Sequence, residues 1–169
     1  AGRDVETTLI GSVGVDEHGH IVRREMNALG VETALVEVAD GETTVKYLVV
    51  DRGGEVMVLG NEGANEHYSV DDVDVAAIRG ADHLHLTNQR PATALELAET
   101  AVEADVSMSF DAGRRIADRA YDPVVELTDC LFVNDREADL VESEGLLDGV
   151  RTVVVKHGAD GAEVREGAT

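Results

Sequence analysis

The sequence predicts an α/β fold built on a mostly parallel sheet. Short apolar runs alternate along the chain with stretches in which apolar residues recur at helical spacing. This alternation is typical of βα units, in which right-handed crossovers join parallel strands. One segment, residues 43–59, breaks the rhythm with two apolar runs around Asp51-Arg52-Gly53-Gly54 and predicts an antiparallel hairpin.

The first half of the chain begins with a predicted strand at residues 8–13. A helix is expected to start at Asp16 or Glu17, with Val22, Met26 and Leu29 on one face, and Gly30 follows as its C-terminal cap. The hairpin strands are expected at 43–50 and 55–59. Ser69, with Asp72 as its reciprocal partner, predicts the start of a helix that runs to Ile78.

Apolar runs in the second half predict the central strands, because strands of a parallel sheet are buried on both faces. These runs are residues 81–86, 106–110, 130–133 and 152–156. Pro91 predicts a helix start, and the inner face of that helix carries Ala94, Leu97, Ala98 and Ala101. A further helix is expected from Asp135, and residues 162–165 are expected as a last strand.

Composition sets the class of protein. With 169 residues and a hydrophobic fraction of 43%, the chain is long enough for one domain with a sizeable core. No run of eighteen apolar residues and no signal peptide is present, so we expect a soluble, cytoplasmic protein. The one cysteine, Cys130, lies in an apolar strand and is expected to be a core residue.

The charge balance is strongly acidic, with 35 acidic against 14 basic residues and a net charge of −21. Such a surface repels nucleic acid and anionic membranes, so neither is expected as a partner. Disorder is an alternative interpretation, but the regular Val, Leu and Ala pattern argues against it. We therefore expect a halophilic protein, because salt screens the repulsion between carboxylates.

Two polar strings follow predicted strands. Asn134-Asp135-Arg136-Glu137 comes after residues 130–133, and Lys156-His157-Gly158-Ala159-Asp160-Gly161 comes after residues 152–155. Ligands of open α/β sheets bind at the carboxyl ends of the strands, so the two strings suggest a phosphate site. A helix capping box at Asn134 and Glu137, and a glycine turn between strands, are structural alternatives that need no ligand.

Three earlier segments precede these strings at suitable intervals: Gly11-Ser12-Val13-Gly14-Val15-Asp16-Glu17-His18-Gly19, Gly63-Ala64-Asn65, and Phe110-Asp111-Ala112-Gly113-Arg114-Arg115. Together the motifs resemble the ribokinase-like (PfkB) family of carbohydrate kinases. The resemblance implies a three-layer α/β fold in which residues 1–169 form an incomplete domain. It also implies that residues 43–59 are a small β-hairpin lid over the sugar, which often forms a homodimer contact.

The resemblance assigns a nucleotide side to the site, with ATP and Mg²⁺ as the implied ligands. Asn134 and Glu137 match the family's Asn-x-x-Glu motif, which helps to organise Mg²⁺, usually through water, and the phosphates. Asp135 and Arg136 replace glutamates that are common at these positions in the family. Lys156 and Gly158 match positions that line the nucleotide, and Gly161 shapes the turn.

The resemblance also suggests substrate contacts. Residues Asp111 to Arg115 resemble the Asp-Pro-Asn-x-Arg signature of the fructokinase and 2-keto-3-deoxygluconate kinase branches, with Ala112 and Gly113 in place of Pro and Asn. Arg115 is the candidate for an oxyanion contact, because its guanidinium pairs with an oxyanion at two points; a solvated helix-start arginine is the alternative. The remaining candidates are Lys46 and Leu48 on the lid and Thr87 and Asn88 after residues 81–86.

The implied function is an ATP-dependent carbohydrate kinase that transfers the γ-phosphoryl group to a sugar hydroxyl, with fructose or a keto sugar acid favoured and ribose as another candidate. The family's Gly-Ala-Gly-Asp motif, which holds the catalytic aspartate, does not occur in the chain. We therefore expect an internal piece of a longer kinase, inactive by itself. The alternatives are a non-catalytic sugar- or nucleotide-binding domain and an unrelated α/β module.

Overall fold

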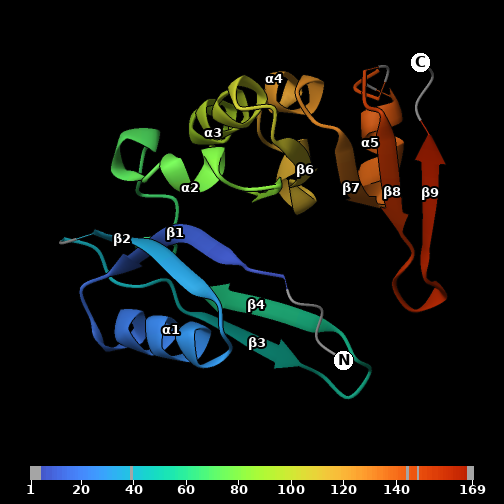
Figure 1. The fold of residues 1–169 in the computed structure, drawn as a ribbon. Coiled ribbons are helices and arrows are strands. Elements are labelled where there is room, and N and C mark those ends of the chain that lie inside the picture. Colours follow the sequence, from blue (N-terminus) through green and yellow to red (C-terminus); the bar gives the residue numbers. More distant parts are fainter. Residues whose placement is uncertain (1–4, 39, 144, 148, 167–169) are drawn as a thin grey trace. The chain divides into compact units, whose positions relative to one another are not determined.

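The computed structural model describes residues 5–38, 40–143, 145–147 and 149–166. The chain divides into two compact units, Ala1–Asp74 and Val75–Thr169, each with sheets of its own. In Figure 1 the first unit runs from blue to green and the second from green to red. No helix among the described residues is long and apolar enough to cross a membrane.

The first unit begins with a βαβ arrangement. Strand β1 (Thr8–Gly14), helix α1 (Glu17–Ala28) and strand β2 (Glu32–Val38) follow one another, and β1 pairs in parallel with β2 from Thr8 beside Glu32 to Gly14 beside Val38. The predictions of β1 and α1 are confirmed. Strand β2 was not predicted, because glutamates near both ends of a short segment weaken its apolar signal.

A hydrogen-bonded cluster around Asp16 joins the start of α1 to the chain near Thr43. The Asp16 carboxylate accepts the amides of Gly19 at 2.8 Å and Thr43 at 2.7 Å, and the Thr43 hydroxyl at 2.6 Å. The Gly14 amide donates to the same hydroxyl at 2.9 Å. These bonds, led by the one from the Thr43 hydroxyl, lower the pKa of Asp16 to about 2. Asp16 is therefore the N-cap of α1 and a tertiary anchor.

The predicted hairpin is confirmed as β3 (Lys46–Val50) paired antiparallel with β4 (Val56–Gly60). The Asp51 carboxylate closes its turn by accepting the amides of Gly53 at 2.7 Å and Glu55 at 2.9 Å. Every residue of both strands is exposed within the structure. The hairpin therefore presents apolar side chains on both of its faces.

The helix predicted from Ser69 to Ile78 is not continuous. A 3₁₀ turn, η1 (Val70–Asp72), is followed by an extended Val73, and a separate short helix α2 spans Ala76–Arg79. Asp72 accepts the Ser69 amide and hydroxyl, both at 2.9 Å, as expected for the reciprocal partner. The helix breaks because Val73 buries its side chain in an extended conformation.

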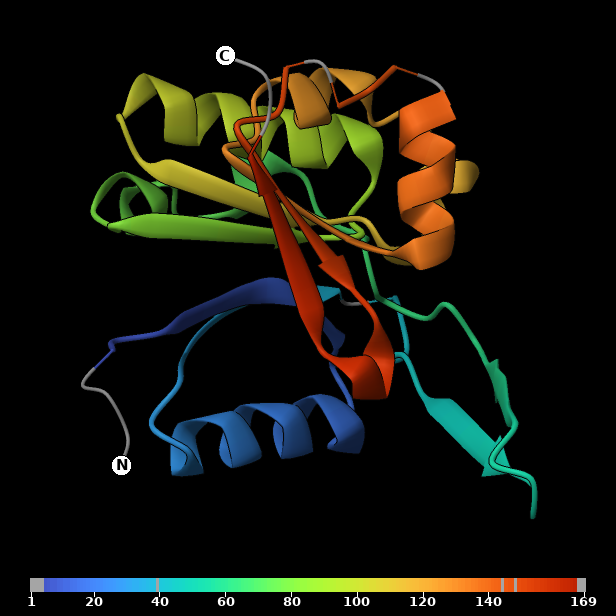
Figure 2. The same cartoon turned by 90° about the vertical axis from the view of Figure 1, so that its right-hand side faces the viewer.

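The second unit is a five-stranded sheet with the order β5-β6-β7-β8-β9. Its strands are β5 (His83–Thr87), β6 (Ser107–Asp111), β7 (Cys130–Asn134), β8 (Thr152–Lys156) and β9 (Ala162–Glu166). All neighbours pair in parallel except β9, which runs antiparallel to β8 (Figure 2). Helices α3 (Pro91–Glu103), α4 (Asp122–Glu126) and α5 (Asp135–Ser143) and 3₁₀ turns η2 (Gly113–Ala117) and η3 (Gly158–Asp160) complete it.

One face of this sheet forms the core with the helices. Its buried side chains are Leu86, Met108, Phe110, Leu131, Val133, Val153 and Val155. The predicted inner face of α3 is confirmed, since Ala94, Leu97, Ala98 and Ala101 are all buried. Phe110 meets Tyr121 edge to face, with ring centroids 5.0 Å apart. Strand alternation then places the last residues of β6, β7 and β8 on the opposite face.

Asp16→Asn is expected to lower the thermal midpoint by several degrees at neutral pH. The folded state holds the Asp16 pKa at about 2, below its ordinary value of 3.8. The carboxylate therefore stabilises the fold above about pH 4, and this contribution is lost as the pH falls toward 2. Thermal melts of Asp16→Asn and of the exposed control Asp40→Asn from pH 2 to 7 test this. Equal midpoints for the two variants at pH 7 would contradict it.

Candidate functional site

Four strands of the second unit end at the same edge of the sheet in polar residues. These residues are Thr87, Asp111, Asn134 and Lys156. Thr87 is paired with Asp111, and Asn134 with Lys156. Parallel pairing therefore brings together side chains that are far apart in the sequence, as the sequence predicted for Asn134 and Lys156.

Asn134 and Glu137 form a complete capping box at the start of α5. The Asn134 amide donates to Glu137 Oε2 at 2.9 Å, and the Glu137 amide donates to Asn134 Oδ1 at 3.0 Å. Glu137 is buried, with 7% of its surface exposed. The alternative interpretation, a helix capping box, is thus correct for Asn134 Oδ1 and Glu137 Oε2. Within the described part of the chain, Glu137 Oε1 and Asn134 Nδ2 make no hydrogen bond and are available to a ligand.

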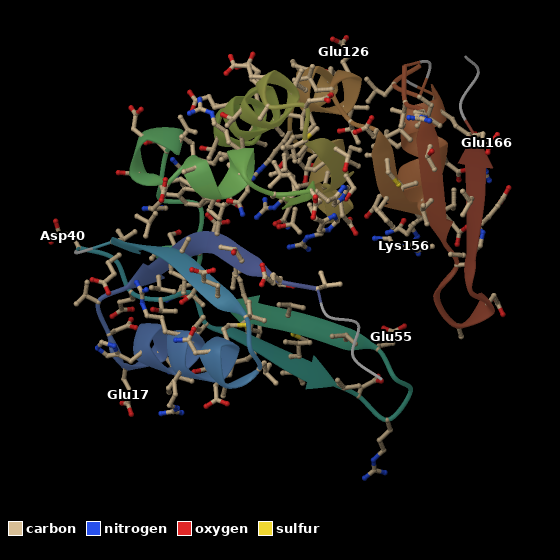
Figure 3. All side chains as sticks on the ribbon, viewed as in Figure 1. Glu17, Asp40, Glu55, Glu126, Lys156 and Glu166 are labelled. Atoms are coloured by element: carbon tan, nitrogen blue, oxygen red, sulfur yellow. The ribbon has the colours of Figure 1, made fainter. Side chains whose placement is uncertain are left out.

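Lys156 forms an ion pair with Asp111 across the intervening strand β7. Asp111 Oδ2 receives the ammonium, while Oδ1 accepts the Gly113 amide at 3.1 Å. Lys156 is 41% exposed, so its ammonium remains accessible to solvent. Figure 3 labels Lys156 at the end of β8. A cation held at the edge beside Asn134 is suited to binding an anion.

Glycines shape the turn from β8 into β9. Gly158 has φ +60 and Gly161 has φ +99, values that side chains disfavour. The His157 amide donates to the Gly161 carbonyl at 2.8 Å and closes the turn. The His157 ring lies 2.6 Å from Asp135 Oδ1. The turn is thus linked to the first residue of α5, a contact that no local sequence pattern signals.

The predicted substrate residues are distributed over both units. Arg115 lies half-buried in η2, directly after β6, while Thr87 and Asn88 are exposed at the end of β5. In the first unit, the Lys46 ammonium donates to the Asn61 carbonyl at 2.8 Å, and Leu48 is 65% exposed. The roles proposed for these residues stay predictions.

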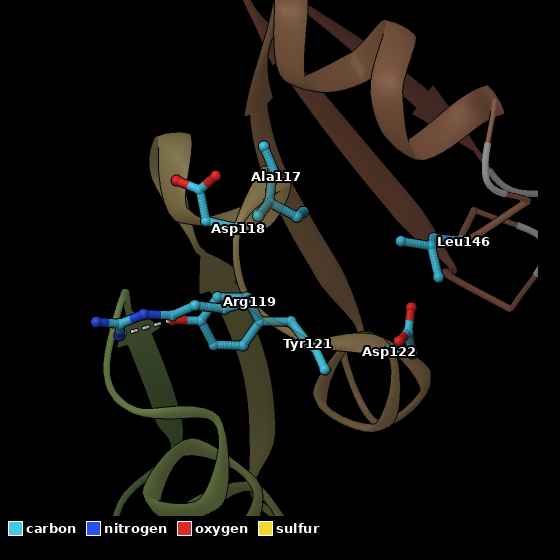
Figure 4. Close-up of a pocket in the computed structure, with 8 residues that line it drawn as sticks. Ala117, Asp118, Arg119, Tyr121, Asp122 and Leu146 are labelled. Atoms are coloured by element: carbon cyan, nitrogen blue, oxygen red, sulfur yellow. Dashed lines mark hydrogen bonds between the residues drawn. The ribbon is translucent and has the colours of Figure 1, made fainter.

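A cavity of about 260 Å³ lies elsewhere in the second unit (Figure 4). It is lined by residues 116–122 and Leu146, none of which is a predicted site residue. Tyr121 beside it donates its hydroxyl to the Gln89 carbonyl at 2.5 Å, and Arg119 donates to the same carbonyl at 2.9 Å. These bonds fix the segment after β5. We therefore interpret the residues beside the cavity as structural and do not place the candidate site there.

The described residues contain no cluster of side chains that could coordinate a metal ion directly. In residues 5–38, 40–143, 145–147 and 149–166, no three His, Cys, Asp or Glu side chains gather in a way that could hold a metal ion. One carboxylate oxygen of Glu137 suits contact with the waters of a hydrated cation, whereas Asn134 Nδ2 is a donor that suits a phosphate oxygen. The residues therefore fit Mg²⁺ that reaches them through water.

A model of the pfkB family of carbohydrate kinases matches residues 2–169. The chain belongs to the PfkB family. An ATP-dependent ribose-1-phosphate kinase of Halopiger xanaduensis is 51% identical over 170 residues, which cover 97% of this chain and 57% of that protein. An uncharacterised sugar kinase of Archaeoglobus fulgidus is 29% identical and is covered to 71%. The chain thus spans little more than half the length of the ribose-1-phosphate kinase.

Solved structures confirm the predicted fold class. Ribokinase from Giardia lamblia matches with a TM-score of 0.83 at 20% identity, over 95% of this chain and 56% of that one. Adenosine kinase from Sinorhizobium meliloti matches with a TM-score of 0.83 at 16% identity, over 98% and 57% respectively. The ribokinase-like α/β fold is therefore shown, and the sequence-based recognition of the PfkB family was correct.

Glu137→Gln and Glu137→Ala are expected to separate capping from ligand binding. Glutamine keeps an oxygen for the Asn134 amide, so its thermal midpoint should stay near wild type, whereas alanine should cost about 1 kcal/mol of unfolding free energy. Both should weaken Mg²⁺-dependent nucleotide binding by on the order of tenfold, because the charge is lost. Calorimetric titration of the complete gene product with ADP and Mg²⁺ measures this. Unchanged affinity for ADP and Mg²⁺ in Glu137→Gln would show that Glu137 only caps the helix and does not take part in ligand binding.

Proposed function

We propose that this chain is part of an ATP-dependent kinase that phosphorylates ribose 1-phosphate. The observation that carries the proposal is the 51% identity to the ribose-1-phosphate kinase across 97% of the chain. The edge formed by Asn134, Glu137 and Lys156 supports a phosphate-binding role. No relative described above is named for fructose or a keto sugar acid, so ribose 1-phosphate replaces them as the favoured substrate.

The nucleotide half of the proposed site is in the second unit. The first amides of α5 and the Lys156 ammonium supply positive potential for the phosphates of ATP. Glu137 would accept from the waters around Mg²⁺, and Asn134 Nδ2 would donate to a water-bridged phosphate oxygen; bound Mg²⁺ would supply neutralisation of charge on the transferred phosphoryl group. The Gly158–Gly161 turn leaves the backbone open to the nucleotide. The catalytic base is assigned to the family's Gly-Ala-Gly-Asp motif, which is not among these 169 residues.

Arg115 is the proposed contact for the phosphate that ribose 1-phosphate already carries. It follows Asp111 at the sheet edge, and its guanidinium can pair with two phosphate oxygens. Thr87 and Asn88 are proposed to contact sugar hydroxyls from the end of β5. Lys46 and Leu48 are proposed to cover the sugar from the hairpin of the first unit.

The test is a coupled ADP-release assay of the complete gene product with ribose 1-phosphate, ribose, fructose and a keto sugar acid. We expect ribose 1-phosphate to give the highest kcat/KM. Arg115→Gln should raise KM for ribose 1-phosphate by about tenfold, since a bidentate charged contact is lost, and should affect ribose much less. The exposed neighbour Arg114→Gln is the control.

Two results would contradict the proposal. A higher kcat/KM for fructose or a keto sugar acid would reject the substrate and keep the kinase. Nucleotide or sugar binding without phosphorylation of any acceptor would favour the alternative, a non-catalytic binding domain with the kinase fold.

We also propose that the hairpin pairs with a second copy of the chain. Eight large apolar residues of β3 and β4 are 50% or more exposed: Tyr47, Leu48, Val49, Val50, Val56, Met57, Val58 and Leu59. An isolated hairpin with apolar side chains on both faces is stable only when other groups cover those faces. The proposed sugar would cover one face, and a second copy of the chain is proposed to cover the other. Leu59→Lys is expected to shift the complete protein from dimer to monomer in sedimentation. A wild-type protein that sediments as a monomer would reject this.

The proposed environment is a high-salt cytoplasm. A net charge of −21 on 169 residues creates strong self-repulsion in dilute buffer, and molar salt shortens its range to a few ångströms. We expect the thermal midpoint to rise by more than 10 °C, roughly, between 0.1 M and 3 M KCl. Equal midpoints in both buffers would contradict a halophilic adaptation.

A further inference from the structure

A hydrogen bond between His157 and Asp135 connects the two polar strings at the sheet edge. His157 Nδ1 lies 2.6 Å from Asp135 Oδ1. Asp135 is the first residue of α5, and His157 follows the last residue of β8. The pair therefore connects the helix capped by Asn134 with the turn that carries Gly158.

The other ring nitrogen of His157 faces β9. Nε2 lies 3.8 Å from Glu163 Oε2, whereas Arg165 approaches the same carboxylate to 3.2 Å. Glu163 is thus engaged mainly by Arg165, on its own strand. The shorter contact to Asp135 sets the direction of the His157 ring.

The Asp135–His157 pair contributes little to the stability of the fold. The Asp135 side chain is 66% exposed and that of His157 is 29% exposed. Ion pairs at such positions gain little free energy, because water solvates both partners and two side chains must be ordered. A contact of this kind matters for the placement of the segment that it holds.

The held segment is closed by its own backbone bonds and by the pairing of β8 with β9, and the contact of His157 with Asp135 links it to α5. Gly158 and Gly161 give the turn conformational freedom, and the backbone bond from His157 to Gly161 closes the turn on itself. The preceding Lys156 is drawn across β7 toward Asp111. Two consecutive residues are therefore anchored on different elements, Lys156 on β6 and His157 on α5.

We propose that Asp135 and His157 are positioning residues for ATP. Their hydrogen bond holds the turn at residues 157–161 against the N-terminus of α5, so that the turn backbone and the helix amides face one phosphate chain. This inference rests on the proposed function and adds to it two residues that do not themselves contact the reacting atoms.

The test compares variants of the complete gene product. Asp135→Ala and His157→Ala are each expected to raise KM for ATP and the Kd for ADP by about fivefold, less than the tenfold that a full ionic contact commands. Neither should change kcat or KM for ribose 1-phosphate. Asp135→Glu should stay near wild type, and the exchange Asp135→His with His157→Asp should recover most of the affinity.

Glu142→Gln is the matched control. It removes the 2.6 Å pair between Arg165 and Glu142, which ties the same helix to the same β8–β9 hairpin at the far end of α5. This variant should leave the ADP affinity unchanged. Hydrogen exchange of residues 157–161 without nucleotide should be faster in Asp135→Ala and His157→Ala, but not in Glu142→Gln.

The outcomes separate this inference from the proposed function. A wild-type enzyme that uses ATP, with Asp135→Ala and His157→Ala indistinguishable from Glu142→Gln in ADP affinity and hydrogen exchange, would overturn the positioning role alone. A wild-type protein that binds neither ATP nor ADP would overturn both. Loss of kcat without loss of ADP affinity would also reject positioning of the nucleotide.

Discussion

Parallel pairing of β7 with β8, in the register that places Asn134 beside Lys156, is the constraint on which the candidate site depends. Because both strands run in the same direction, their polar ends meet at one edge, and α5 starts there. The buried side chains Leu131 and Val133 of β7 and Val153 and Val155 of β8 fix this register, since a slip of β8 by one residue would turn Val153 and Val155 out of the core. The apolar core and the proposed chemistry therefore depend on the same alignment.

The negative net charge of the chain restricts where a polyanion such as ATP could bind. A chain with 35 acidic and 14 basic residues repels a polyanion such as ATP over most of its surface. The proposed ATP binding then requires local positive potential, for which the N-terminus of α5 and Lys156 are the proposed sources, together with the Mg²⁺ of the proposed site. Asp111 partly neutralises Lys156 in the structure, so an arriving phosphate competes with an internal carboxylate for that ammonium.

The sequence predicted the parts of the fold that rest on apolar runs. Residues 130–133 and 152–156 are continuous enough to identify as buried strands, and the capping pattern of Asn134 and Glu137 is local, so both were found. Strand β2 was missed because Glu32 and Glu37 lie within it, and the helix from Ser69 was overextended because burial of Val73 outweighs local propensity. The fold class followed from the alternation of elements, which does not depend on these errors.

The long-range side-chain contacts of the site could not be predicted from the sequence for a different reason. Lys156 and Asp111 are 45 residues apart, and His157 and Asp135 are 22 apart, so their contacts exist only once three strands are aligned. The capping box does not exclude the proposed ligand binding, because each side chain uses one polar atom for the helix and keeps another.

The most direct test of the central claim is a crystal structure of the complete enzyme with Mg²⁺ and a non-hydrolysable ATP analogue. We expect phosphate oxygens within hydrogen-bond distance of the Lys156 ammonium and the first amides of α5, with Glu137 facing the hydrated Mg²⁺. A nucleotide bound away from this edge, with the Lys156–Asp111 pair and the Asn134–Glu137 box untouched, would contradict it.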